Sequence, residues 1–113
     1  MSEKNQSEQI IGVPFKYTDL VDYQTGSIVS RIILKKTVGT ITLFAFDAGQ
    51  SLSPHSTPYE ALVEIVEGKA MISIEDTEHP VSAGQQIILP AGKTHAVDAP
   101  ERFKMVLTMI KAD

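Results

Sequence analysis

The chain has 113 residues and carries 10 Lys and Arg against 14 Asp and Glu, a formal net charge of −4. This length suits a single domain with one hydrophobic core, and we predict one domain over residues 1–113 with a polar N-terminal arm over 1–14. Hydrophobic residues make up 42% and charged residues 21%, which excludes a disordered or low-complexity chain. Because an acidic chain without a basic run is a poor match for a phosphate backbone, no nucleic-acid partner is expected.

The absence of cysteine excludes a disulfide framework, a thiolate metal site and a cysteine nucleophile. Apolar runs are only a few residues long, as at 87–89, whereas a membrane-spanning helix needs roughly 20. The N-terminal residues lack the basic start and apolar centre of a secretory signal. We therefore predict a cytoplasmic protein without a membrane partner.

Short apolar runs separated by glycine-containing turns recur along the chain, and Ile, Val and Thr favour strands. No stretch keeps helical spacing over three turns. In chain order the pattern predicts one short helical turn within 19–24 and strands at 28–36, 40–47, 62–67, 69–75, 78–82, 86–90, 95–98 and 103–110. Many short strands between turn signals indicate an all-β sandwich or barrel.

The predicted strands 28–36 and 103–110 are apolar on both faces. In the first, alternation puts Ile28, Ile32 and Leu34 on one face and Val29 and Ile33 on the other. A strand that is apolar on both sides has to be covered on both sides. We therefore expect a homodimer with 28–36 among its contacts, and the alternative cover is a loop of the same chain.

The stretch from Gly49 to His95 resembles the two sequence motifs of the cupin superfamily. The first family motif reads Gly, five residues, His-x-His, three or four residues, Glu, six residues, Gly. Gly49, His55 and Gly68 match this motif, whereas Thr57 stands at the second His position and Ala61 at the Glu position.

The second family motif reads Gly, five residues, Pro-x-Gly, two residues, His, three residues, Asn. Gly84, Pro90, Gly92 and His95 match it, and Ala99 stands where Asn is usual. The chain thus resembles a small single-domain bacterial-type cupin with degenerate metal-binding motifs. This resemblance implies a double-stranded β-helix (a jelly roll, or cupin barrel) made of two antiparallel sheets.

The resemblance also implies a metal site built from two His and one Glu of the first motif and the His of the second. Only His55 and His95 remain as metal ligands, for Fe, Mn, Ni or Zn, and two imidazoles alone hold a divalent metal weakly. Glu60 is a possible extra ligand, but alternation turns it away from the face of position 61 unless a bulge near Pro58 re-aims it. His79 is interpreted as a surface residue in a turn over 76–80 and is not counted as a ligand.

A small barrel with apolar inward side chains can also hold a small organic molecule. The predicted pocket residues are Thr57, Tyr59, Ala61, Phe46 and Met105, for each of which ordinary core packing is the alternative. The two histidines titrate near neutrality and offer an acid–base pair beside such a ligand.

Three functions stay open at this point. The first is a barrel that binds a small molecule next to His55 and His95, with an incomplete metal site. The second is a divalent-metal-dependent cupin enzyme of the dioxygenase, isomerase or decarboxylase type with a reduced ligand set. The third is a structural or regulatory dimer whose barrel has no cavity. The sequence assigns no catalytic residue, substrate or pathway.

Overall fold

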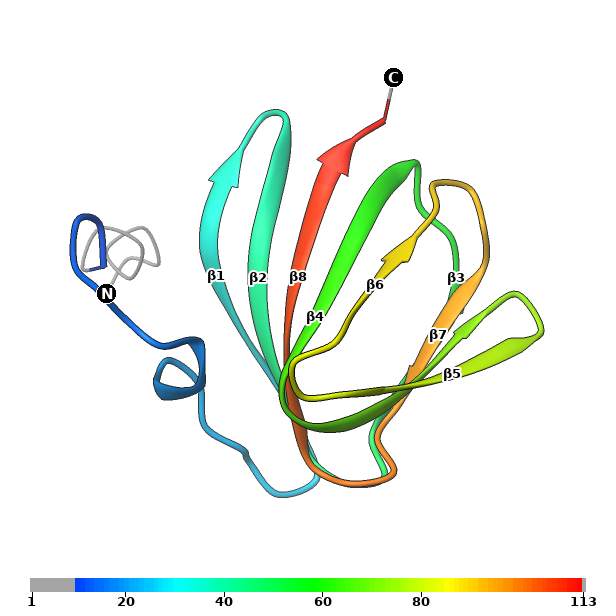
Figure 1. The fold of residues 1–113 in the computed structure, drawn as a ribbon, viewed down its shortest axis with the longest axis horizontal. Helices are drawn as coiled ribbons and strands as arrows, with labels where there is room; N and C mark the ends of the chain where they lie inside the picture. The colour runs from blue at the N-terminus through cyan, green and yellow to red at the C-terminus, as the bar shows by residue number, and fades with distance from the viewer. Residues whose placement is uncertain (1–9, 113) are drawn as a thin grey trace.

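The computed structural model describes residues 10–112, which form a curled antiparallel barrel (Figure 1). A single turn of 3-10 helix, η1 (Tyr17–Asp19), precedes the strands. The strands of the described part are β1 (Ile28–Lys36), β2 (Gly39–Phe46), β3 (Ser51–His55), β4 (Tyr59–Ile74), β5 (Thr77–Ser82), β6 (Gln86–Leu89), β7 (His95–Asp98) and β8 (Phe103–Lys111). The predicted all-β class and double-stranded β-helix are confirmed.

Two antiparallel sheets share the long strand β4. The first half of β4 pairs with β6 and β8, and the sheet continues through β2 to β1; we call this sheet A. The second half of β4 pairs with β5 and β7, and β7 pairs with β3; we call this sheet B. Because one strand belongs to both sheets, the sheets curl toward each other and enclose the core between them (Figure 1).

Gly68 marks the point at which β4 passes from sheet A to sheet B. Its φ of +76° is left-handed, and an added Cβ would lie 2.1 Å from the Arg102 carbonyl oxygen and 2.9 Å from the Phe103 Cα. Only glycine accepts both this conformation and this close approach. The predicted strands 62–67 and 69–75 are therefore the two halves of one strand that bends at Gly68.

The strand β3 was not predicted. It is an edge strand whose pairing with β7 is interrupted between Leu52 and His55, and four of its five residues are exposed. Pro54 lies within the interruption, which is where an edge strand tolerates proline. The predicted helical turn over 19–24 is found slightly earlier, at Tyr17–Asp19.

Apolar side chains pack on both faces of sheet A. The inner cluster lies between the sheets and includes Phe46 and Phe103, whose rings stack with centroids 4.5 Å apart. The outer cluster includes Leu43 and Val106 and is covered in part by Val21, which precedes β1. Cover by a segment of the same chain, the alternative that the sequence left open, is thus realised over part of the outer face.

A β-bulge in β1 changes which side chains share a face. The register against β2 shifts between Ile32 and Leu34, so Ile33 is an extra residue. Ile28 and Ile32 face the interior, whereas Leu34 lies opposite Ile41 on the outer face. The prediction that Ile28, Ile32 and Leu34 share one face is therefore wrong beyond the bulge.

The segment before β1 is fastened to the outer face by polar contacts. The buried Lys104 Nζ donates a hydrogen bond to the Thr18 carbonyl at 2.8 Å, and the Tyr23 hydroxyl donates to the Glu67 carboxylate at 2.5 Å. Burial is the main cause that raises the pKa of Tyr23, and the hydrogen bond to Glu67 is the next.

Of the predicted polar arm over 1–14, residues 1–9 lie outside the described part. No helix in the described part has the length and apolar character needed to cross a membrane.

Candidate functional site

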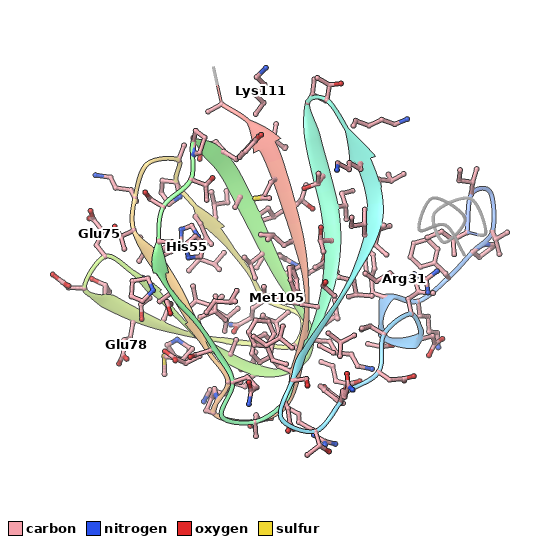
Figure 2. The ribbon with its side chains drawn as sticks, turned by 180° about the vertical axis from the view of Figure 1, so that it is seen from behind. Arg31, His55, Glu75, Glu78, Met105 and Lys111 are labelled. Carbon is pink, nitrogen blue, oxygen red and sulfur yellow. The ribbon has the colours of Figure 1, made fainter. Side chains whose placement is uncertain are left out.

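The two candidate histidines lie side by side on neighbouring strands of sheet B. His55 ends β3 and is paired in register with His95, the first residue of β7. Their ring centroids are 4.5 Å apart and the ring planes meet at 66°. His95 is 8% exposed, whereas His55 is exposed. Figure 2 shows the His55 ring on the inner side of its strand, facing the space between the sheets.

The hydrogen bonds of the two rings differ. The Nδ1–H of His55 donates to the Ser53 carbonyl at 2.8 Å, which leaves its Nε2 as a free acceptor. The Nδ1 of His95 is buried and has no hydrogen-bond partner of good geometry in the described part of the chain. A buried polar atom of this kind is expected to hydrogen-bond to an ordered water molecule or to a bound ligand.

Burial lowers the pKa of His95 below its ordinary value of 6.5, because it penalises the charged imidazolium. The neighbouring His55 adds to this shift, and a weaker contact with the Lys93 backbone opposes it. His95 is therefore neutral at pH 7 and available as an acceptor or a donor.

The lowered pKa predicts a pH-dependent stability of the metal-free protein. Between the folded and unfolded pKa values of His95 the unfolded chain binds more protons, so stability is full above about pH 6.5 and is lost as the pH falls through the folded value. We expect the urea concentration at the unfolding midpoint to be lower at pH 5.5 than at pH 7.5. This decrease is expected to be smaller in His95→Gln. An equal loss in both proteins would contradict this assignment.

Glu60 does not join the histidines. It lies opposite Ile110 on the outer face of sheet A, and its carboxylate accepts a hydrogen bond from the Ala91 N–H at 3.1 Å. The bulge in β4 lies between Ile65 and Glu67, too far along the strand to re-aim Glu60. No group of three or more His, Cys, Asp or Glu that could hold a metal occurs among the described residues. Two imidazoles without a carboxylate do not fit the metal site that the family motif implies.

The predicted pocket residues fall into two groups. Phe46 and Met105 are fully buried in the core, and Figure 2 shows Met105 deep between the sheets. Ala61 is 3% exposed and faces inward, opposite Met109 and Leu89 in the neighbouring strands. These three residues belong to the inner cluster and pack the interior.

Thr57 and Tyr59 lie closer to the open end of the barrel than these three residues. At this end, which we call the mouth, lie the β1–β2 turn, the start of β4, the β6–β7 loop and the end of β8 (top of Figure 1). Thr57 Oγ1 accepts a hydrogen bond from the Tyr59 N–H at 2.8 Å. Tyr59 lines a hollow of about 310 Å³, which is within the range of small-molecule sites. The other lining residues are Lys35, Lys36, Thr37, Gly39, Thr40 and Met109.

His79 corrects a prediction. It lies within β5 rather than in a turn, is half-buried, and stands opposite Ile72 on the inner face of sheet B. The turn itself is limited to Glu75 and Asp76, since Ile74 already pairs with Thr77.

Sequence reasoning also missed two lysines at the mouth. Lys35 lies opposite Thr40, and Lys111 lies opposite Tyr59; both partners face inward. For Lys111 the alternation along 103–110 carried the signal. For Lys35 no signal existed, because the bulge at Ile33 sets which way it points.

Comparison with known proteins agrees with this fold. A family model described as the cupin domain matches residues 42–111, and the chain belongs to the cupin family. Membership and fold together support a small-molecule- or metal-binding barrel in general terms. No curated protein matches the chain.

Three solved structures illustrate the likeness. A conserved protein of unknown function from Streptococcus pyogenes is 35% identical, with a TM-score of 0.84 and coverage of 88% of each chain. A cupin superfamily protein from Desulfitobacterium hafniense is 25% identical, with a TM-score of 0.84 over 88% of this chain and 91% of that one. A cupin 2 conserved barrel domain protein from Leptotrichia buccalis is 35% identical, with a TM-score of 0.85 over 88% of this chain and 48% of that one.

Proposed function

We propose that the protein binds a small organic molecule at the mouth of the barrel, next to His55 and His95. The observation that carries this proposal is the histidine pair itself, with rings 4.5 Å apart on the inner face, beside the apolar inner cluster. Small-molecule sites combine an apolar wall with a few polar groups that orient the ligand. The free Nε2 of His55 and the unpartnered Nδ1 of His95 are such groups.

A divalent-metal-dependent enzyme of the dioxygenase, isomerase or decarboxylase type is the second candidate. It is favoured by the His55 Nδ1–H bond to the Ser53 carbonyl, an arrangement that orients the ring of a metal-ligating histidine. Against it stands the donor set, because Thr57 and Ala61 supply no imidazole or carboxylate and Glu60 is held by Ala91. We therefore place small-molecule binding first.

The proposal is tested by recording proton–carbon NMR spectra of the histidine side chains while a fragment library is added to the metal-free protein. We expect fragments that bind to shift the His55 and His95 ring signals and to leave the His79 ring signals nearly unchanged. His55→Ala should abolish the shifts at His95. Fragments that shift neither ring at millimolar concentration, or shift only residues outside the barrel, would overturn the proposal.

We also propose that two copies of the chain associate through the outer face of sheet A. Register places one side chain from each strand in a straight row across this face, which we call the outer row. Its members are Leu34, Ile41, Thr108, Leu62 and Ile88. Leu34 is 43% and Ile88 63% exposed, and contiguous exposed apolar surface of this kind marks an interaction site.

A second copy is the occupant that the symmetry of the row favours. A two-fold axis along β8 lays the β1 end of one row on the β6 end of the other, so that Leu34 and Ile41 meet Ile88 and Leu62, with Thr108 at the axis. In the neighbouring row, Lys36 stands at the β1 end and Glu60 on β4. The same axis brings these opposite charges toward each other.

This association predicts a dimer in light scattering, with twice the 12.3 kDa mass of one chain. Ile88→Asp is expected to give a folded monomer, because its side chain is exposed and its charge would have to be buried in the interface. Val13→Asp, which alters an exposed apolar side chain outside the outer row, is the control and should remain dimeric. A wild-type monomer at high protein concentration would refute the dimer. The cytoplasmic location stays a prediction from the sequence.

A further inference from the structure

We propose that the molecule bound at the mouth is an anion, a small carboxylate with an apolar body. This inference rests on the proposed function and names the ligand class of the same site. It follows from the distribution of charge between the two faces of the barrel, which differs sharply from the charge of the chain as a whole.

Strand register shows which titratable side chains lie on the inner face of their strands. Those on the inner face carry either an ammonium or an imidazole; they are Lys35, Lys111, His55, His79 and His95. No Asp or Glu of the described strands lies on the inner face. The chain carries a net charge of −4, so an interior without carboxylates is the reverse of its overall balance.

The carboxylates of the strands all lie outside. Glu60 and Glu64 are on the outer face of sheet A, and Glu78 and Asp98 are on the outer face of sheet B. Figure 2 shows Glu78 and the hairpin residue Glu75 pointing away from the barrel. Glu60 lies near the mouth, as the second residue of β4, and its hydrogen bond to the Ala91 N–H holds it on the outer side.

The mouth itself is basic and rich in hydroxyl groups. The hollow there is lined by Lys35 and by the side chains of Thr40 and Tyr59, and Lys111 lies opposite Tyr59 at the rim (Figure 2). Lysine ammonium and hydroxyl groups donate hydrogen bonds to a carboxylate. A cation placed there would be repelled by the ammonium groups of Lys35 and Lys111.

Below the hollow the inner face becomes apolar. Met109 lines the hollow, and Leu107 and Phe44 follow it toward the fully buried core. A ligand whose charged end meets the lysines of the mouth therefore places an uncharged, apolar body against these side chains. This combination defines a small organic carboxylate rather than an inorganic anion.

The test uses three probes of one shape and different charge: benzoate, benzamide and benzamidine. Dissociation constants are measured by NMR titration of the metal-free protein at pH 7.5 and low salt. We expect benzoate to bind at least tenfold more tightly than benzamide, benzamidine to bind more weakly still, and benzoate to shift the signals of His55 and His95. Inorganic phosphate should bind more weakly than benzoate, because it lacks the apolar body.

The lysines supply the matched variants. Lys35→Gln and Lys111→Gln each remove one charge from the mouth and should each weaken benzoate binding about threefold to tenfold, while leaving benzamide unchanged. Lys69→Gln removes the same charge from the outer face of sheet B and should change neither the affinity for benzoate nor that for benzamide. Because these lysines are exposed, the variants are expected to fold.

The outcomes separate this inference from the proposed function. Benzamide or benzamidine binding at the histidines as tightly as benzoate would overturn the anion inference and leave small-molecule binding intact. Benzoate binding that Lys69→Gln weakens as much as Lys35→Gln would also overturn it, because the effect would then be one of net charge. No probe shifting the histidines would count against both proposals.

Discussion

The Gly68→Ala variant is expected to lose about 3 kcal/mol or more of its free energy of unfolding, and Gly68→Val is expected not to fold. Two independent costs add at this position. The backbone φ of +76° is unfavourable for any residue with a Cβ, and that Cβ would lie 2.1 Å from the Arg102 carbonyl oxygen. The atoms that the Cβ would meet belong to the backbone of Arg102 and Phe103, at the start of β8. This backbone cannot move without breaking the pairing of β4 with β8.

Gly92→Ala is the matched control for this prediction. Gly92 has a similar φ of +81°, but an added Cβ would meet nothing within 4 Å. The control therefore carries the conformational cost alone, about 1 kcal/mol. Chemical unfolding of both variants measures the difference. Equal losses at the two glycines would show that close approach at Gly68 does not matter, and that β4 can bend in another way.

The double variant Thr57→His with Ala61→Glu is expected to gain tight binding of Ni²⁺ or Zn²⁺. It restores the two ligand types that the family motif has and this chain lacks, beside the existing His55 and His95. A four-ligand site is worth about 10–16 kcal/mol in apparent binding free energy, so two added ligands should strengthen binding by on the order of a thousandfold or more. Isothermal titration of the variant and the wild type measures the gain.

The control for the metal site is Thr57→His with Ala61→Gln, which has the same side-chain size without the carboxylate. It should bind metal more weakly than the Glu variant. Since Ala61 is buried, circular dichroism first establishes that each variant folds, and Thr57→His alone tests a third ligand if the doubles do not. A folded Glu variant with the affinity of its Gln control would mean that position 61 does not face the histidines.

The strands predicted from the sequence were those with strong apolar alternation and glycine-marked ends. The limits of β1 and β7 agree with the prediction, because both have β-branched or apolar side chains bounded by turns. The strand β3 was not predicted, because it is held by pairing with β7 and its own sequence is polar and contains proline. The sequence predicts a turn at Gly68, since a glycine that bends one strand and a glycine that ends it look alike in sequence.

The candidate site was predictable only as far as motif spacing reaches. The resemblance to the cupin motifs identified His55 and His95, 40 residues apart in sequence, and the structure places their rings together. It could not orient His79, because the hairpin is shorter than its polar residues suggest. Nor could it turn Lys35 inward, because the direction of that side chain depends on a bulge that no local sequence feature marks. The positive charge at the mouth thus depends on the pairing register of β1 with β2, which the sequence does not reveal.

The metal content of the purified protein tests the central claim most directly. Untagged protein, prepared without chelator and without a nickel column, is incubated with Fe, Mn, Ni or Zn, desalted, and measured by elemental mass spectrometry. A small-molecule barrel with two imidazoles and no carboxylate predicts metal well below one per chain in every case. About one metal per chain, lost in both His55→Ala and His95→Ala, would contradict this account and make the protein a metal-dependent cupin.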